Sequence, residues 1–238
     1  MQSICGIIAY LITSKYFKRS IPESIIWALT VALSNHVTLL LPITEIYFQK
    51  NVITQVASII LMDGIILLSI IAFFLELSTK KNVNLFNFIK NLFLNPFILS
   101  IIIGLLFLLL NFNIDQTPIE YTLSKLAACV SPVGLFAIGI TLSFYTKNVI
   151  NKLSVSISVL KLVISPIILL LIGLVFFNAG LPAEIPGAFF VSVAPCGVTS
   201  IVLCAAYNVS PENIIKAIFV STIAVSYTHL TLPTKPFV

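Results

Sequence analysis

Charged residues are scarce in this sequence, and that scarcity decides the class of protein. Of the 238 residues only 9% are charged, 59% are hydrophobic, and the mean hydropathy is +1.12. A soluble domain usually carries about 25% charged residues. The composition therefore excludes a water-soluble fold and predicts an integral membrane protein. At about 20 apolar residues per crossing, a chain of this length holds at most about eight or nine spans.

Groups that bind metals or catalyse reactions are also few. The four cysteines, Cys5, Cys129, Cys196 and Cys204, lie in apolar stretches without a Cys-x-x-Cys pair, and we interpret them as inert buried thiols. The sequence has two histidines and no GxxxxGK[ST] nucleotide-binding pattern. Its net charge of +5 comes from basic residues scattered between apolar runs. Such scattering is typical of loops that set membrane topology, and it does not indicate nucleic-acid binding.

Long apolar runs predict eight membrane segments. They cover residues 3–17, 24–47, 52–76, 94–112, 121–145, 153–178 and 185–207, and an eighth begins near 213 and runs past 225. The loops after the first, third and fifth segments are rich in lysine and arginine, whereas the intervening loops are not. The positive-inside rule therefore predicts that the basic loops are cytoplasmic and that the N-terminus is external.

Three consecutive segments resemble three later ones, which indicates an internal repeat. Segments one to three pair with segments six to eight, and Pro42 and Pro195, central to one such pair, are 153 residues apart. An offset of five segments reverses the membrane orientation of the second copy, giving the inverted repeat typical of secondary transporters. The fourth and fifth segments have no earlier counterparts. We therefore expect an intact 5+5 protein with two further helices before Met1.

The end of the sequence does not fit a membrane helix. The apolar run stops about 12 residues into the eighth segment, too early to cross a bilayer, and 226–238 resembles translated sequencing-adapter sequence. We predict a transmembrane transporter domain over 1–225 and a non-native tail over 226–238. His229 lies in that tail and is given no function.

Two charged residues lie within apolar segments. Asp63 is near the middle of the third segment, where a charge costs roughly 2.5–3.5 kcal/mol, so it should face a cavity or a cationic partner. It is a candidate for proton or cation coupling, although a protonated or paired structural carboxyl is an alternative. Lys161 lies about eight residues into the sixth segment and either pairs with Asp63 or meets an anionic substrate.

Prolines within segments two and seven predict broken helices. Proline removes a backbone donor, and in lipid the freed carbonyl must be satisfied by protein or by water in a cavity. Asn35 and His36 precede Pro42, and Pro195 is followed by a glycine and two hydroxyl residues. Broken helices place the N-termini of half-helices at the membrane midplane, where their dipoles favour anions. The substrate-binding candidates are Asn35, His36, Pro42, Pro195, Gly197, Thr199 and Ser200.

The ordered motifs resemble those of the auxin efflux carrier family, which includes malonate-transporter-like bacterial members. The resemblance spans about residues 3–225 and is carried by Asn35–Pro42, Leu94–Ile98 with Gly104, Ser131–Gly139, Leu160–Val163 with Pro166, Ala194–Pro195 and Ser221–Thr222. Val37 and Leu40 stand where the family usually has glycines. The resemblance implies an all-α, inverted-repeat transporter bundle with two crossed broken helices, and ten helices in the intact protein. It also implies an elevator-like carrier of organic anions.

We therefore expect a secondary transporter, a permease or efflux carrier for malonate or auxin-like carboxylates, in a bacterial inner membrane. Its expected partners are the organic anion, protons or another cation, the lipid bilayer and a second copy in a homodimer. No cofactor, metal or nucleic acid is expected, and the protein is not expected to be an enzyme. The alternatives are an intramembrane lipid-modifying enzyme, for which the sequence lacks clustered His, Asp or Glu, and a non-transporting structural membrane subunit.

Overall fold

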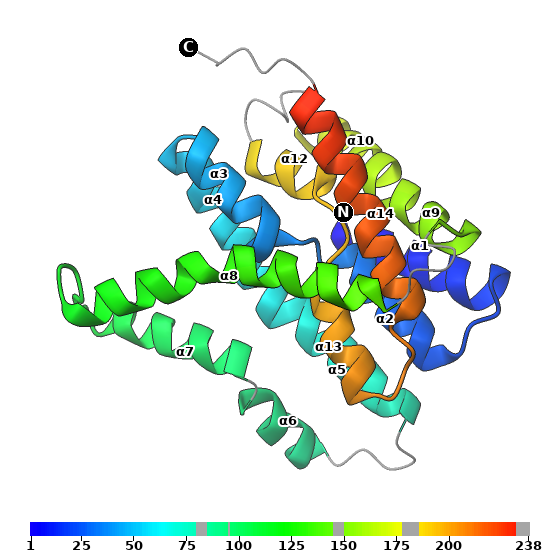
Figure 1. Cartoon of the computed structure of the whole chain (residues 1–238). Helices are drawn as coiled ribbons and strands as arrows, with labels where there is room; N and C mark the ends of the chain where they lie inside the picture. Colours follow the sequence, from blue (N-terminus) through cyan, green and yellow to red (C-terminus); the bar gives the residue numbers. More distant parts are fainter. Residues whose placement is uncertain (80–84, 95, 145–149, 178–185, 232–238) are drawn as a thin grey trace.

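The computed structural model describes residues 1–79, 85–94, 96–144, 150–177 and 186–231. These residues form a bundle of helices with no β-strand among them (Figure 1), which confirms the predicted all-α class. One isolated antiparallel bridge between Ser34 and Cys196 is the sole extended pairing in the described ranges.

The first three predicted segments are helical. Segment one is α1 (Gln2–Leu11) with a π-helical turn, η1 (Ile12–Tyr16), and segment two is α2 (Ile21–Ala32), a break, a π-helical turn η2 (His36–Leu40) and α3 (Leu41–Tyr47). Segment three runs without interruption through α4 (Lys50–Met62), the π-helical turn η3 (Asp63–Leu67) and α5 (Leu68–Thr79). Ser20 caps α2 by accepting a hydrogen bond from the Glu23 backbone N–H, and Pro22 occupies the first turn.

The later segments follow in the predicted order. They are α7 (Pro96–Leu109), α8 (Pro118–Ser143), α9 (Lys152–Val159) continued by η4 (Leu160–Ile164) and α10 (Ser165–Phe177), then α12 (Pro186–Val193), α13 (Thr199–Ala206) and α14 (Glu212–Thr231). A further short helix, α6 (Leu85–Phe93), was not predicted. Its sequence alternates apolar residues with Asn and Lys at helical spacing, so it lacks the continuous apolar run by which membrane segments are recognised.

Three helices in the described part of the chain are long and apolar enough to cross a membrane. They span Lys50–Thr79, Pro118–Thr141 and Lys152–Phe176, with mean hydropathies of 2.6, 1.8 and 2.8. In the second of these only 6% of the most apolar stretch is buried within the protein. An apolar helix with so little protein contact suits a lipid environment, because exposing so large an apolar surface to water is unfavourable.

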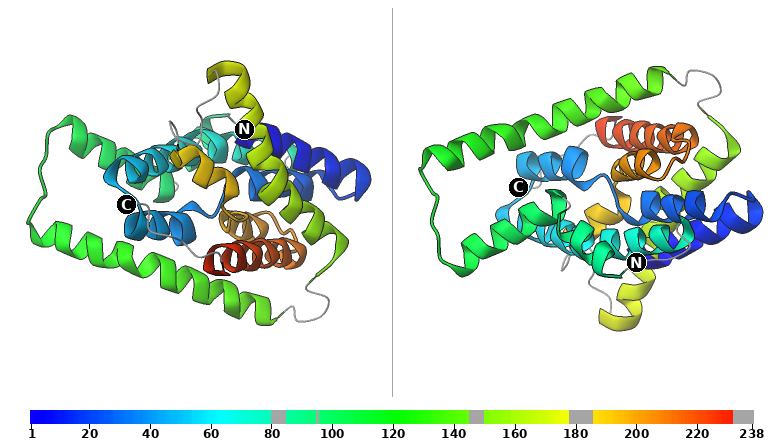
Figure 2. Two further views of the ribbon diagram at one scale, coloured as in Figure 1. Left: turned by 90° about the horizontal axis from the view of Figure 1, so that it is seen from above. Right: turned by 90° about the horizontal axis from the view of Figure 1, so that it is seen from below.

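The core lies where α1, α2, α9, α13 and α14 meet. Trp27, Ile26 and Ile157 are fully buried there among other apolar residues. Helices α1 and α2 approach closely at Gly6, where a Cβ atom would lie 3.2 Å from the Ala28 carbonyl oxygen. By contrast, α8 crosses one face of the bundle and extends beyond it to the turn that leads back to α7 (Figures 1 and 2).

The two broken helices cross each other at their breaks. Their breaks lie at 33–35 and 194–198, and they run antiparallel where Ser34 pairs with Cys196. Ser34 and Cys196 are 162 residues apart, as are the first residues of α4 and α14. The offset of 153 derived from the two prolines was therefore wrong. Pro42 is not the counterpart of Pro195, because the first break lies seven residues before Pro42.

The predicted non-native tail is partly described. Helix α14 continues to Thr231, so 226–231 is helical, and 232–238 lies outside the described residues. Nothing in the structure tests the origin of this segment, and it stays a prediction.

Candidate functional site

The two breaks satisfy each other's backbone groups where they cross. The Asn35 N–H donates to the Pro195 carbonyl (2.9 Å), and the Gly197 N–H donates to the Thr30 carbonyl (3.0 Å). The Cys196 N–H donates to the Ser221 hydroxyl (3.1 Å), which comes from α14. Unwound backbone in the middle of a membrane protein needs such partners, since lipid offers none.

Gly197 is required by the closeness of this crossing. A Cβ atom at this position would lie 1.7 Å from the Leu33 carbonyl oxygen and 2.8 Å from its carbon. Our prediction placed Gly197 among the substrate-binding residues, which would be one reason for a glycine here. The structure gives a different reason, because any side chain here would push the two backbones apart.

Pro195 leaves one backbone carbonyl without its helical donor, and two side chains donate hydrogen bonds to it. Proline has no N–H to donate to the carbonyl four residues earlier, which is that of Val191. That oxygen accepts the Ser34 hydroxyl (3.1 Å) and the Lys161 ammonium (3.4 Å). Lys161 is 1% exposed, and its charge lies at the C-terminal end of α12, where the helix dipole favours a cation.

Pro42 acts in the same way within a continuous helical segment. It lies in the first turn of α3, and its missing N–H frees the Thr38 carbonyl. The Ser131 hydroxyl of α8 donates to that carbonyl at 2.6 Å. Nearby, a Cβ atom on Gly134 would come within 2.7 Å of the Thr38 methyl group. Pro42 therefore helps to join the first broken helix to α8 and does not break the helix itself.

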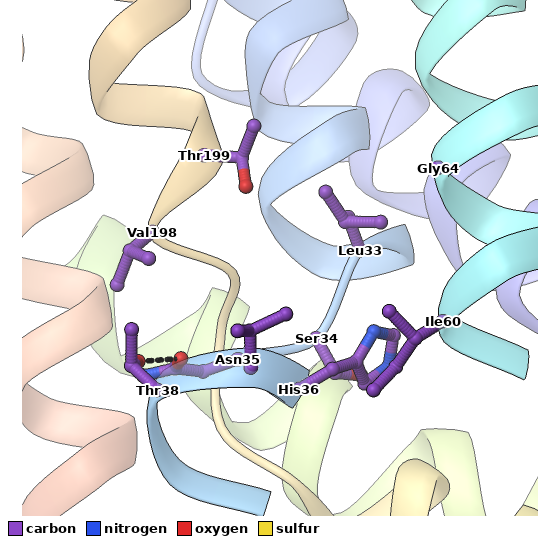
Figure 3. A pocket seen from close by; sticks show the side chains of 10 residues that line it. Leu33, Ser34, Asn35, His36, Thr38, Ile60, Gly64, Val198 and Thr199 are labelled. Atoms are coloured by element: carbon purple, nitrogen blue, oxygen red, sulfur yellow. Dashed lines mark hydrogen bonds between the residues drawn. The ribbon is translucent and has the colours of Figure 1, made fainter. Parts of the chain in front are cut away.

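A small pocket opens beside the crossing (Figure 3). Its volume is about 50 Å³, enough for a few water molecules. Of the predicted binding residues, Asn35, His36 and Thr199 line it; Pro42, Pro195, Gly197 and Ser200 do not. Ser200 is buried and donates to the Gly197 carbonyl (2.8 Å). The pocket wall consists of Leu33, Ser34, Asn35, His36, Val37, Thr38, Ile60, Gly64, Val198 and Thr199.

Asn35 presents an unused hydrogen-bond donor to this pocket. The side chain is 2% exposed, and its Oδ1 accepts a hydrogen bond from the Thr38 hydroxyl, drawn as a dashed line in Figure 3. No partner for its Nδ2 exists in the described part of the chain. A buried donor without a partner costs about 1–3 kcal/mol, so a ligand that offers an acceptor would relieve this cost.

Two helix N-termini meet at the same pocket. One is that of the helical segment η2–α3, which follows Asn35, and the other is that of α13, which begins at Thr199. The first N–H groups of a helix lack intrahelical acceptors and carry partial positive charge. Together with the Asn35 amide, they form an environment suited to an anion.

A buried polar cluster extends from the pocket wall. His36 Nε2 lies 3.7 Å from Asp63 Oδ2, and the Gln2 amide donates to the same oxygen at 2.7 Å. His36 is 3% exposed and Asp63 is 5% exposed. The predicted pair between Asp63 and Lys161 does not form within ion-pair distance; Lys161 acts on Asp63 only through the longer-range Coulomb interaction.

Sequence reasoning missed several residues of this site. The missed residues are Ser34, Gln2 and Ser131, which each form a hydrogen bond with a residue far away in the sequence, and Thr38, which bonds within the adjoining turn. Ser34 and Thr38 flank Asn35 in an apolar segment, and such a polar run was a usable signal. Gln2 was not recognisable, because nothing in the sequence brings the first turn of α1 to Asp63.

A sequence profile described as "membrane transport protein" matches residues 1–232. The chain belongs to the membrane transport protein family. This is the auxin efflux carrier family that the motifs resemble. Family membership and the apolar helices indicate a multi-pass membrane transporter. No curated protein sequence matches the chain significantly.

The crossing is thus part of a membrane transport protein. In the transporter's described residues no group of three or more His, Cys, Asp or Glu is arranged to hold a metal ion. The crossing offers instead amide, hydroxyl and backbone donors.

Proposed function

We propose that this transporter moves small organic anions across the cell membrane and binds them in the pocket beside the crossing. The observation that carries the proposal is the unpaired Asn35 amide, buried between the N-termini of η2 and α13. A carboxylate accepts several hydrogen bonds and carries the charge that two positive helix ends favour.

Each lining residue has a definable task. Asn35 Nδ2 donates to one carboxylate oxygen, while Thr38 holds the amide by donating to its Oδ1. Thr199 contributes its hydroxyl and the first backbone N–H of α13 to the second oxygen. Ser200, whose hydroxyl bonds the Gly197 carbonyl, supports this turn from behind. The crossover prolines and Gly197 shape the backbone that carries these donors.

The size of the pocket supports a small substrate. At about 50 Å³ it accepts a carboxylate group but not a drug-sized molecule, whose sites typically measure about 300–1,000 Å³. Malonate or the acidic end of an auxin-like carboxylate fits this description, and the rest of a larger substrate requires the crossing to open. Val37 is 37% exposed beside the pocket and would contact the remainder of such a substrate.

Asp63 and Lys161 balance charge around the pocket in this proposal. Lys161 neutralises the C-terminal end of α12 through the Val191 carbonyl, and Asp63 offsets the lysine at longer range. An isolated charge in a membrane interior is costly, so the pair keeps the empty site near neutrality. Coupling of transport to a cation would use these groups.

Uptake into liposomes tests the proposal. Radiolabelled lactate, malonate, succinate and indole-3-acetate are offered to vesicles with the wild-type protein, with Asn35→Ala, or with Asn51→Ala. Asn51 is an exposed residue at the start of α4 and serves as the matched control. We expect uptake of at least one carboxylate by wild type and Asn51→Ala, and a loss of about tenfold or more in Asn35→Ala, since hydrogen bonds to charged groups contribute about 1.5–3 kcal/mol.

Two results would count against this function. Uptake of no carboxylate by correctly inserted wild-type protein would remove the anion assignment and raise the enzymatic and structural alternatives. Equal uptake by Asn35→Ala and Asn51→Ala would keep the carrier and reject the pocket as its binding site.

A further inference from the structure

We propose that His36 and Asp63 form a shared proton-binding pair, and that the transporter carries one proton with each organic anion. The inference rests on the proposed function, because it assigns the coupling ion of the same site. It adds His36, which links the pocket wall to the buried carboxyl of Asp63.

The geometry of the pair is suited to sharing a proton. His36 Nε2 and Asp63 Oδ2 are 3.7 Å apart, close enough for a proton to move between them after a small shift of either side chain. His36 Nε2 is buried and has no hydrogen-bond partner among the described residues. Gln2 fixes the Asp63 oxygen from α1, so the carboxyl keeps its position whether or not the proton is present.

His36 also lies where it can sense a substrate. Among the ten residues that line the pocket it is the only titratable one. Figure 3 shows its ring in the pocket wall next to Ile60, on the same turn as Asn35. An anion held by Asn35 therefore lies one residue from an imidazole that can become positively charged, and each stabilises the other.

The charges around the pair indicate how many protons are needed. The charged groups that act on His36 and Asp63 are Lys161 from η4 and the amino group of Met1 at the start of α1. Met1 is only half-buried, so its amino group is solvated and is left out of the count of buried charges. Of the fully buried groups, Lys161 and ionised Asp63 cancel. A monovalent carboxylate leaves the buried site with one uncompensated negative charge, which is expensive in a low-dielectric interior. One proton on the pair removes it.

Three of the buried titratable groups, all close to the crossing, share a backbone feature. His36 begins η2, Asp63 begins η3, and Lys161 lies within η4. Single π-helical turns inside α-helices are frequently found at functional sites. The coincidence at three separate helices supports a common role for these side chains in the transport cycle.

The step conserves atoms and charge. A proton from the side of entry binds the imidazole or the carboxylate as the anion binds Asn35, and both leave on the other side. No covalent bond in the substrate changes, and no oxidant or reductant is needed.

The wild-type protein provides the first test. Vesicles that contain a pH-sensitive dye are given a carboxylate from the panel that is transported, and proton and substrate entry are counted together, with protein-free vesicles as the blank. We expect one proton per substrate molecule. With no membrane potential, an inward gradient of one pH unit should drive about tenfold accumulation of the anion. When one proton enters with each anion, the ratio of anion inside to outside equals, at equilibrium, the ratio of protons outside to inside.

Variants then assign the proton site. The sequence has two histidines and two aspartates, so His229→Gln and Asp115→Asn are matched controls for His36→Gln and Asp63→Asn. In both site variants we expect accumulation driven by the pH gradient to fall from about tenfold to none. Downhill substrate exchange should be slower than in the wild type, because His36 lines the pocket, but still measurable. The control variants should accumulate substrate as the wild type does.

Different failures identify different errors. Substrate entry without proton entry in the wild type would overturn the coupling while leaving the proposed function intact. Gradient-driven accumulation that persists in His36→Gln would remove His36 from the proton site even if coupling itself is real. If a variant does not insert into the membrane, the proton count on the wild-type protein still tests the coupling, because it needs no substitution. Failure of all uptake would refute the proposed function instead.

Discussion

Replacing Gly197 by alanine should separate the two broken helices. The added Cβ would lie 1.7 Å from the Leu33 carbonyl oxygen, far inside van der Waals contact and against backbone that cannot rotate away. The crossing must open to admit the methyl group. Opening it weakens the bond from the Gly197 N–H to the Thr30 carbonyl and the bond from the Asn35 N–H to the Pro195 carbonyl.

The cost follows from these two bonds. Loss of each bond leaves a buried backbone group unsatisfied, which costs about 1–3 kcal/mol. The substitution should therefore destabilise the protein by about 2–6 kcal/mol. Transport should fall at least tenfold, since the donors of the pocket are carried on the same turns. Alanine elsewhere in a helix is expected to be neutral or stabilising relative to glycine.

Thermal unfolding in detergent, followed by a thiol-reactive dye, measures this effect. Cys5, Cys196 and Cys204 are buried and become reactive as the bundle opens. Gly139→Ala is the control, because a Cβ atom at Gly139 meets nothing within 4 Å. Equal unfolding midpoints and equal uptake for the two variants would refute the account of the crossing.

Three further substitutions test individual contacts. Ser131→Ala leaves the Thr38 carbonyl without its donor and should destabilise the protein by about 1–3 kcal/mol in the same unfolding assay. Ser34→Ala and Lys161→Met each remove one donor from the carbonyl freed by Pro195, so in a double-mutant cycle the double variant should lose more stability than the two single losses combined. Thr38→Val frees the Asn35 amide to rotate and should raise the KM for uptake about fivefold, equivalent to about 1 kcal/mol.

Each of these has a contrary result. For Ser131, an unfolding midpoint equal to that of Ser124→Ala, an exposed serine of the same helix, would show that the α8 contact does not matter. Strict additivity in the cycle would mean that the two donors do not share one acceptor. An unchanged KM in Thr38→Val would show that Asn35 does not depend on the Thr38 hydroxyl for its orientation.

Much of the fold was predictable from hydropathy. A segment that crosses a membrane must pair its own backbone groups and is therefore a helix, and its lipid-facing side chains make it recognisable as an apolar run. All eight predicted segments are helical. Helix α6 was missed because its polar residues interrupt such a run. The position of the first break was also misjudged, because proline was treated as the breaking residue. In the structure the break at 33–35 is set by pairing with 194–198, which is a tertiary contact.

The site was predictable only in part, because it too depends on tertiary contacts. Asn35, His36 and Thr199 stood out as polar residues near prolines in apolar segments, and they line the pocket. Asp63 was recognisable by its cost in lipid, but its partners were not. The structure brings it to His36 and Gln2, whereas the sequence offered Lys161 as the obvious opposite charge. Partners distant in the sequence depend on how helices pack, which composition does not encode.

Protection of a cysteine by substrate tests the central claim most directly, that an organic anion binds beside the crossing. In a Cys129→Ser background, which removes the exposed native thiol, Thr199→Cys is labelled with a charged methanethiosulfonate reagent. Asn113→Cys, in an exposed loop, is the control. The account predicts that a transported carboxylate such as malonate slows labelling at 199 and leaves labelling at 113 unchanged. Labelling at 199 that a transported carboxylate does not alter would contradict it.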